Sequence, residues 1–103
     1  MIARLWRGRA AHPVDADAYA RHATGTVFPS LKSLAGHRGA YLLRRDTDDG
    51  TEFLALTLWD SQQSIAAFAG NDVSKAVVEP EARAVLSHFD DFAIHYEVVP
   101  AAA

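Results

Sequence analysis

A chain of 103 residues has room for one domain, and its 50% apolar and 22% charged residues are typical of a globular protein. The absence of cysteine excludes disulfides, thiol nucleophiles and thiolate metal sites, and is consistent with a cytoplasmic location. A net charge of −3 and the lack of an apolar run of ~20 residues argue against nucleic-acid or membrane partners.

The charges are distributed unevenly along the chain. Residues 1–45 contain eight of the ten Lys and Arg residues, whereas residues 46–103 contain eleven of the thirteen acids. We favour the interpretation that strands from the two halves lie side by side and pair their charges. The alternative is a basic patch that attracts an anionic ligand.

The N-terminal third of the chain predicts a strand followed by a helix. Residues 2–9 mix aliphatic, aromatic and Arg residues without turn formers, which favours a strand. Asp15 is expected to cap a helix that ends at Ala35, with a kink or break near Phe28 because Pro29 removes an intrahelical hydrogen bond. The helix carries an apolar stripe at i, i+4 steps, formed by Tyr19, Ala23, Val27 and Leu31.

A β-hairpin is predicted next. Residues 38–45 and 51–59 read as strands, and the Asp- and Gly-rich sequence DTDDG at 46–50 separates them. The apolar alternation predicts a register with Leu42 opposite Leu54, and this leaves a five-residue loop from Asp46 to Gly50.

The remaining elements follow from capping residues and alternation. Asp60 and Ser61 supply an N-cap for a short helix that Gly70 ends. Pro80 fits the first turn of another helical stretch. Residues 91–99 alternate in polarity and predict the last strand.

The element order is β-α-β-β-α-β, which predicts an α+β fold of the ferredoxin-like kind with a four-stranded antiparallel sheet. We expect one domain at residues 1–99 and a C-terminal tail at 100–103. The helices are predicted to cover the face with Ala3, Leu5, Leu42, Leu54, Leu56, Leu58, Ile94 and Tyr96. The other face would then display Arg4, Trp6, Tyr41, Leu43, Phe53, Thr57, Trp59, His95 and Glu97, and this apolar surface requires a second subunit or a ligand to cover it.

Four stretches of the chain resemble the antibiotic biosynthesis monooxygenase family of small dimeric α+β barrel proteins. They are MIARLWRG, GHRGAYLLRR, FLALTLWDSQQSIAAFAG and FAIHYEVV. The resemblance implies a homodimer with a pocket for a small aromatic or hydrophobic molecule. It also implies oxidation of an electron-rich aromatic substrate, a quinol or polyketide-type compound, by molecular oxygen without metal or flavin, so we expect no cofactor.

The haem-degrading branch of the family is a less close match. That branch uses an Asn on the first strand, a Trp in the second helix and a His axial ligand. The matching positions here are Arg4, Phe68 and Val78. The resemblance therefore does not favour haem degradation.

His95 and Arg4 are the candidate catalytic residues. An imidazole with a pKa near ~6.5 suits a base that removes a phenolic or enol proton. The structural alternative is a half-buried interface histidine bonded to a neighbouring carboxylate or carbonyl. Arg4 lies within a strand and needs either a carboxylate, for which Glu97 is the candidate, or a ligand anion that it would stabilise.

Four aromatic residues are candidates for substrate binding by stacking: Trp6, Tyr41, Phe53 and Trp59. For each of them we favour packing in the core or interface, most strongly for Trp59. No two histidines have ligand spacing on one element, so no structural metal is expected. The alternative function is a non-catalytic dimer that binds or sequesters a hydrophobic ligand.

Overall fold

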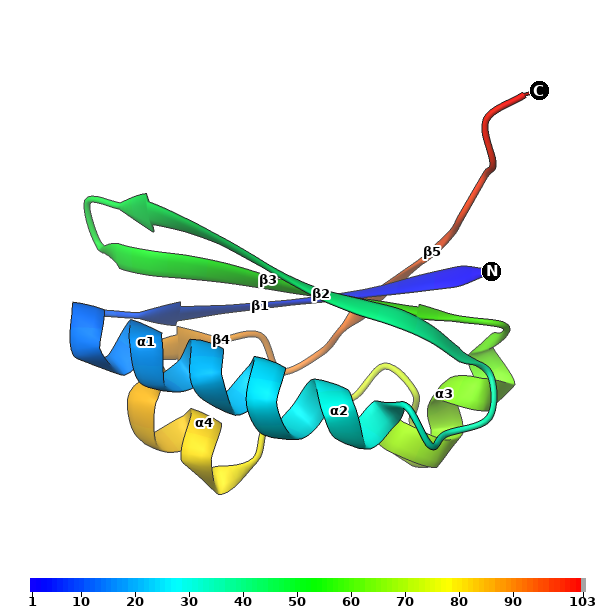
Figure 1. Ribbon diagram of the computed structural model, residues 1–103, viewed down its shortest axis with the longest axis horizontal. Helices are drawn as coiled ribbons and strands as arrows, with labels where there is room; N and C mark the ends of the chain where they lie inside the picture. The colour runs from blue at the N-terminus through cyan, green and yellow to red at the C-terminus, as the bar shows by residue number, and fades with distance from the viewer. Residues whose placement is uncertain (103) are drawn as a thin grey trace.

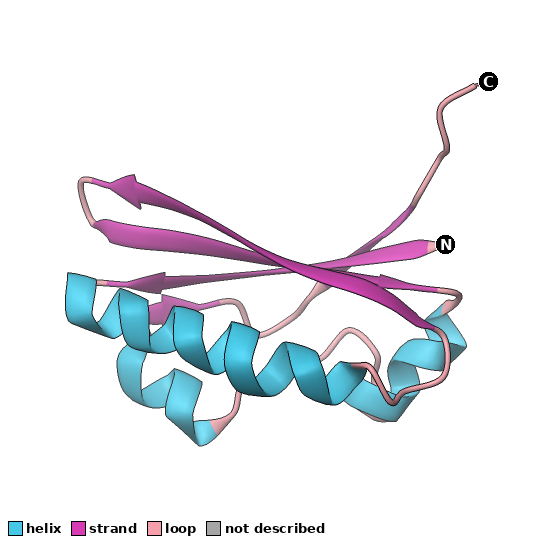
Figure 2. Cartoon of the chain, in the orientation of Figure 1, coloured by secondary structure: helices cyan, strands magenta, loops and turns pink. Residues whose placement is uncertain are grey.

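The computed structural model describes residues 1–102, in which all helices lie on one face of an antiparallel sheet (Figures 1 and 2). Ala103, the last residue of the expected tail, lies outside the described residues. The elements are β1 (Ile2–Ala10), α1 (Pro13–His22), the π-helix η1 (Ala23–Val27), α2 (Phe28–Leu31), β2 (His37–Thr47), β3 (Gly50–Trp59), α3 (Gln62–Ala69), α4 (Pro80–Val85), β4 (His88–Phe89) and β5 (Ile94–Glu97).

The sheet has the order β2-β3-β1-β4, and β5 also pairs with β1. The ferredoxin-like arrangement is therefore confirmed, with β1 and β3 in the centre. The last strand expected at 91–99 is shorter than predicted, because only β5, at Ile94–Glu97, lies in this stretch and pairs with residues 2–5. A separate two-residue strand, β4, precedes it and pairs with Gly8 and Arg9. No helix within residues 1–102 is long and apolar enough to cross a membrane.

The predicted assignment of the two sheet faces is wrong for β1, β3 and β5. It is correct for β2, where Leu42 packs against the core and Tyr41 and Leu43 lie on the uncovered face. Phe53, Thr57 and Trp59 of β3 are buried beneath the helices, and Arg4 on β1 faces the same side. Both faces of these strands are apolar, so the alternation alone does not show which one the helices cover. The uncovered face carries Ala3, Leu5, Tyr41, Leu43, Leu54, Leu56, Leu58, Ile94 and Tyr96.

The predicted hairpin register is also wrong, by one residue. Leu54 pairs with Leu43 rather than with Leu42, so Leu42 and Leu54 lie on opposite faces of the sheet. The expected five-residue loop is a tight connection in which Thr47 pairs with Gly50. Gly50 has φ 123°, and a Cβ there would lie 2.2 Å from the carbonyl oxygen of Ala10, so only glycine fits this turn.

The first helix begins earlier and is less interrupted than predicted. It starts at Pro13, for which the fixed φ of proline suits a first helical position, rather than after Asp15. Before Pro29 the chain forms the π-helix η1 and then continues directly as α2. The chain therefore stays helical where a kink or break was expected near Phe28, and the change in hydrogen bonding is confined to η1 (Figure 1). Three residues of the predicted stripe, Tyr19, Ala23 and Leu31, are buried against the sheet as expected.

The caps of α3 are confirmed. The Ser61 side chain accepts a hydrogen bond from the backbone N–H of Ser64, and Gly70 ends the helix with φ 85°. The predicted pairing of charges between the two halves of the chain is also observed. The pairs that join the halves are Arg7–Asp90, Arg9–Asp49, Arg38–Asp60 and Arg45–Glu52.

Candidate functional site

A cavity of about 70 Å³ lies between the sheet and the helices. Its wall is mostly apolar but includes one cation, one imidazole and one carboxylate. The residues that line it include Arg4, Trp6, Tyr19, His22, Phe28, Thr57, Phe68 and Glu79. Because a cavity of ~150 Å³ is known to hold benzene, a polycyclic ligand here requires the surrounding side chains to move.

Arg4 is the charged residue at the sheet side of this cavity. It is only 4% exposed, and its guanidinium donates to the backbone carbonyls of Val73 and Lys75. The guanidinium also lies over the aromatic ring of Phe68, and the guanidinium carbon is 5.7 Å from the ring centroid. Burial lowers the pKa of Arg4, although an arginine remains charged at neutral pH.

The carboxylate that sequence analysis assigned to Arg4 is not beside it. Glu97 pairs with Ile2 at the end of β5, and no ion pair joins any carboxylate to Arg4 within residues 1–102. Backbone carbonyls and an imidazole therefore solvate a buried cation that lines a cavity. Arg4 therefore has no ion-pair partner among these residues, and an anionic ligand in the cavity can supply one.

His95 lies directly opposite Arg4 on β5, and the two candidate catalytic residues are in contact. Nε2 of His95 is 2.9 Å from a guanidinium nitrogen of Arg4. Burial and, to a lesser extent, the Arg4 charge lower the pKa of His95, which favours the neutral imidazole. His95 itself does not line the cavity, so Arg4 stands between it and any ligand there.

The carbonyls that hold Arg4 belong to a segment fixed by backbone hydrogen bonds. Ala76 donates to the carbonyl of Asp91, and Ala93 donates to the carbonyl of Ser74. Trp6, which also lines the cavity, donates its indole N–H to the carbonyl of Asp90 at 2.7 Å. The segment between β4 and β5 thus holds Trp6 directly, and it holds Arg4 through the backbone of residues 73–76.

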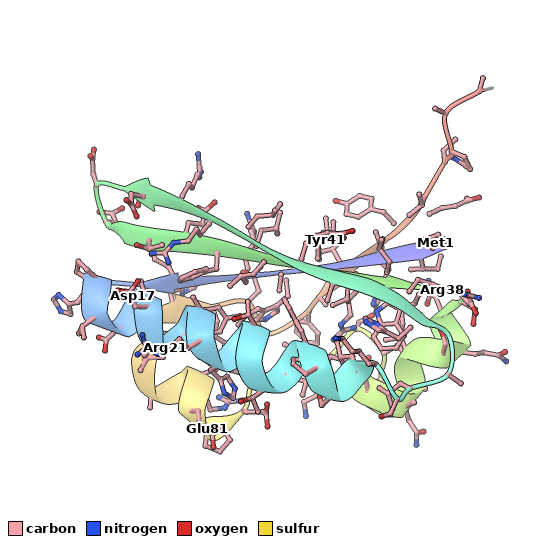
Figure 3. The ribbon with its side chains drawn as sticks, viewed as in Figure 1. Met1, Asp17, Arg21, Arg38, Tyr41 and Glu81 are labelled. Carbon is pink, nitrogen blue, oxygen red and sulfur yellow. The ribbon has the colours of Figure 1, made fainter. Side chains whose placement is uncertain are left out.

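The other predicted substrate-binding aromatics do not reach the cavity. Phe53 and Trp59 are fully buried in the core, where Phe53 packs 4.8 Å from Tyr19 and Trp59 donates to the Thr57 hydroxyl. Tyr41 is 59% exposed on the uncovered face of the sheet (Figure 3). Of the four aromatics, only Trp6 shares the cavity with Arg4.

Two polar cavity residues were missed by the sequence analysis. His22 and Glu79 approach each other with 3.4 Å between Nε2 and a carboxylate oxygen. His22 follows Tyr19 by three residues, a spacing that places it beside the buried stripe of the helix. No such periodic signal exists for Glu79, because residues 71–79 form an irregular connection.

Comparison with known proteins supports one family. The model of the antibiotic biosynthesis monooxygenase family matches residues 4–80, which is more than half of the chain. No functionally curated protein matches the sequence.

Several solved structures share the fold at low sequence identity. A protein from Deinococcus radiodurans described with the same family name has a TM-score of 0.67 at 14% identity, over 100% of this chain and 97% of that chain. The monooxygenase ActVA-Orf6 of Streptomyces coelicolor, in complex with nanaomycin D, has a TM-score of 0.65 at 17% identity, over 99% and 90%. The haem degrader MhuD of Mycobacterium tuberculosis, with two haems in its active site, has a TM-score of 0.65 at 15% identity, over 100% of both chains.

Proposed function

The chain belongs to the antibiotic biosynthesis monooxygenase family, and on this premise we propose that it is a cofactor-independent monooxygenase. Its proposed substrate is an electron-rich aromatic, a quinol or polyketide-type compound, and the oxidant is molecular oxygen. The observation that carries the proposal is the buried Arg4 cation, which has no carboxylate partner within residues 1–102 and lines an apolar cavity.

In this chemistry the substrate supplies the electrons once it has lost a proton. The protein needs to bind the substrate away from water and to stabilise its anion. Arg4 is suited to the second task because its charge is already desolvated, so its attraction to a phenolate or enolate is stronger than it would be in water. The apolar wall and Trp6 supply the dry surroundings.

We propose that His95 holds Arg4 in this orientation. Since arginine has no hydrogen-bond acceptor, Nε2 of His95 must accept from the guanidinium, and its lone pair is then engaged. A role for His95 as the base, which the sequence suggested, requires a substrate to displace this hydrogen bond. The kinetics of His95 variants distinguish the two roles.

The oligomer that we propose is a homodimer. Nine mostly large apolar residues face outward on the uncovered side of the sheet, and Ile94 and Tyr96 are each more than half exposed. A face of this size can bury on the order of 1,000 Å² in a dimer, which is within the range of specific interfaces.

The second candidate function is the binding or sequestration of a small hydrophobic ligand without turnover. The engagement of the His95 lone pair favours it, because the imidazole beside Arg4 is then not free to act as a base. Both functions would use the same cavity.

Oxygen consumption in the presence of a panel of quinols and anthrones tests the proposed function. We expect uptake with at least one of them, and Arg4→Met should abolish or strongly reduce it. Arg21→Met, which removes an exposed arginine from α1, is the matched control and should leave it unchanged. Binding without oxygen uptake across the panel would favour the second candidate, and equal uptake by wild type and Arg4→Met would remove Arg4 from the mechanism.

A further inference from the structure

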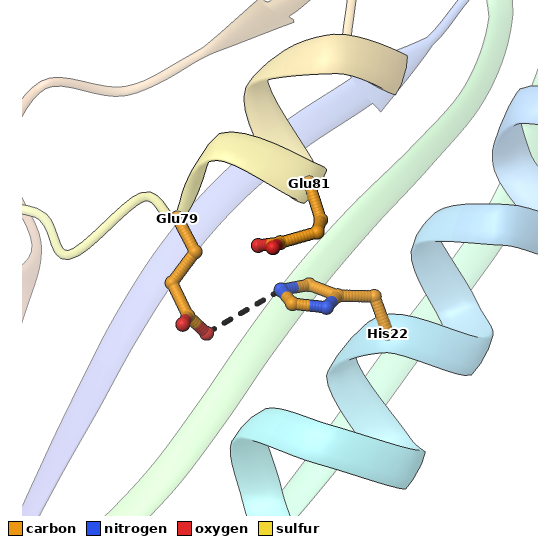
Figure 4. A group of neighbouring side chains, drawn as sticks. All are labelled: His22, Glu79 and Glu81. Carbon is orange, nitrogen blue, oxygen red and sulfur yellow. Dashed lines mark ion pairs between the residues drawn. The ribbon is translucent and has the colours of Figure 1, made fainter.

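Three side chains from two distant parts of the sequence converge beside the cavity, and two of them, His22 and Glu79, line it. His22 is the last residue of α1, Glu79 immediately precedes α4, and Glu81 lies in the first turn of α4 (Figure 4). One donor atom from each residue lies within 4.8 Å of the other two. Both carboxylates are directed toward the imidazole in Figure 4.

From this arrangement we propose that His22, Glu79 and Glu81 bind a divalent transition-metal ion. The spacing of the donors supports it. Two donors that are each about 2.1 Å from a tetrahedral ion lie about 3.4 Å from one another. The distance between Nε2 of His22 and the nearest oxygen of Glu79 is 3.4 Å, so these two residues already have the separation that an ion requires.

The state of His22 provides a second and independent observation. Its side chain is only 11% exposed, and Nε2 is a buried atom that makes no hydrogen bond within the described residues. A buried nitrogen without a hydrogen bond is destabilising, and a metal ion would use its lone pair. A charge-assisted hydrogen bond to Glu79 would also satisfy Nε2, but the 3.4 Å contact between Nε2 and the Glu79 carboxylate does not meet hydrogen-bond geometry.

The donor set indicates the class of ion. One imidazole nitrogen with two carboxylates suits Zn²⁺, Mn²⁺ or Fe²⁺ better than Mg²⁺ or Ca²⁺, which prefer oxygen ligands alone. Glu79 is 45% exposed, so an ion can reach the site from solvent. Three protein ligands leave a coordination position open, and His22 and Glu79 both line the cavity. An anionic group of a bound ligand can therefore complete the coordination.

Sequence analysis led us to expect no structural metal because no two histidines are spaced as ligands on one element. The proposed ligands lie on different elements, and only the packing of α1 against α4 brings them together. This proposal does not depend on the proposed oxygenase activity.

Isothermal titration calorimetry of the untagged, chelator-treated protein with Zn²⁺ tests the site directly. We expect one ion per chain, and we expect His22→Gln and Glu81→Gln each to weaken binding about tenfold or more. The matched control is His12→Gln, which changes an exposed histidine whose side chain makes no capping hydrogen bond to α1. This variant should bind Zn²⁺ as the wild type does.

Thermal unfolding provides a readout that does not depend on heat of binding. Zn²⁺ should raise the Tm of the wild type and of His12→Gln, because an ion that binds only the folded state stabilises it, and at the same concentration it should raise that of Glu81→Gln by clearly less. Glu81 is exposed, so this variant keeps the test valid if His22→Gln does not fold. Absence of 1:1 binding up to millimolar Zn²⁺, or equal binding by wild type and both ligand variants, would overturn the proposal. Since no substrate is present, neither result depends on catalysis.

Discussion

Arg4 donates a hydrogen bond to Nε2 of His95 across 2.9 Å, between the directly paired positions of β1 and β5. The imidazole must therefore carry its proton on Nδ1. Because burial and the adjacent charge both lower the pKa of His95, the neutral form that this contact requires is favoured. The pair is thus a cation held by a neutral acceptor, rather than an ion pair.

The first prediction separates a positioning role of His95 from a basic role. His95→Gln should keep most of the turnover, because the amide oxygen of glutamine can still accept from Arg4. His95→Ala should lower it by about 10- to 100-fold, the effect of losing a hydrogen bond to a charged group. Steady-state kinetics on an active substrate, with Tm values for both variants, provide the measurement. A loss of ~10²–10⁴-fold in both variants would instead identify His95 as the general base.

The second prediction concerns the oligomeric state. Light scattering should give twice the chain mass of 11.2 kDa for the wild type. Leu56→Glu, which places a charge on the uncovered face between Leu5 and Tyr41, should give a folded monomer because an unpaired charge at an apolar interface is strongly unfavourable. Val14→Glu, at a 72% exposed position of α1, is the control and should remain dimeric. A wild-type mass near 11.2 kDa at micromolar concentration would show that the face does not form a dimer.

The third prediction is a loss of stability at alkaline pH. Burial raises the pKa of Tyr19 to about 12 from 10.0, so the unfolded chain releases this proton at lower pH than the folded chain does. The contribution to stability is complete below pH 10 and is lost as the pH rises toward 12. In urea titrations the wild type should lose ~2–3 kcal/mol more than Tyr19→Phe over this range. Parallel pH profiles for the two proteins would show that Tyr19 ionises as freely in the folded state as in the unfolded state.

The fourth prediction assigns Trp59 to the core. It is fully buried, stacks 6.1 Å from Phe68 and donates to the Thr57 hydroxyl, but it does not line the cavity. Trp59→Phe should lower the free energy of unfolding by ~1–3 kcal/mol, through lost volume and an unpaired hydroxyl, and should leave ligand affinity unchanged. Chemical denaturation and a binding titration are the two measurements. A large fall in affinity with unchanged stability would place Trp59 in the binding site.

The sequence by itself determined the elements whose signals are local. Ser61 accepts from the free N–H groups of a first helical turn, and Gly70 adopts a positive φ at little cost, so both ends of α3 were predictable. Likewise, Pro80 begins α4 because its missing N–H has no partner at that position in any helix. The order of these elements was sufficient to predict the ferredoxin-like topology.

Only the tertiary structure decided which face of the sheet the helices cover. Leu54, Leu56 and Leu58 alternate with Phe53, Thr57 and Trp59, so a period of two describes both faces of β3 equally well. Packing decided between them, because the flat indole of Trp59 and the ring of Phe53 fill the space beneath the helices. The same choice shifted the hairpin register by one residue from the predicted one, since such a shift moves the side chains of β3 to the other face.

The candidate sites depend on tertiary structure in the same way. Arg4 is surrounded by groups from β5 and from the segment after α3, and His22 lies beside Glu79 and Glu81 at the start of α4. A side chain's charge state and partners are properties of its neighbours in space. No spacing within one element encodes them, because contacts between distant segments form only when the helices close on the sheet.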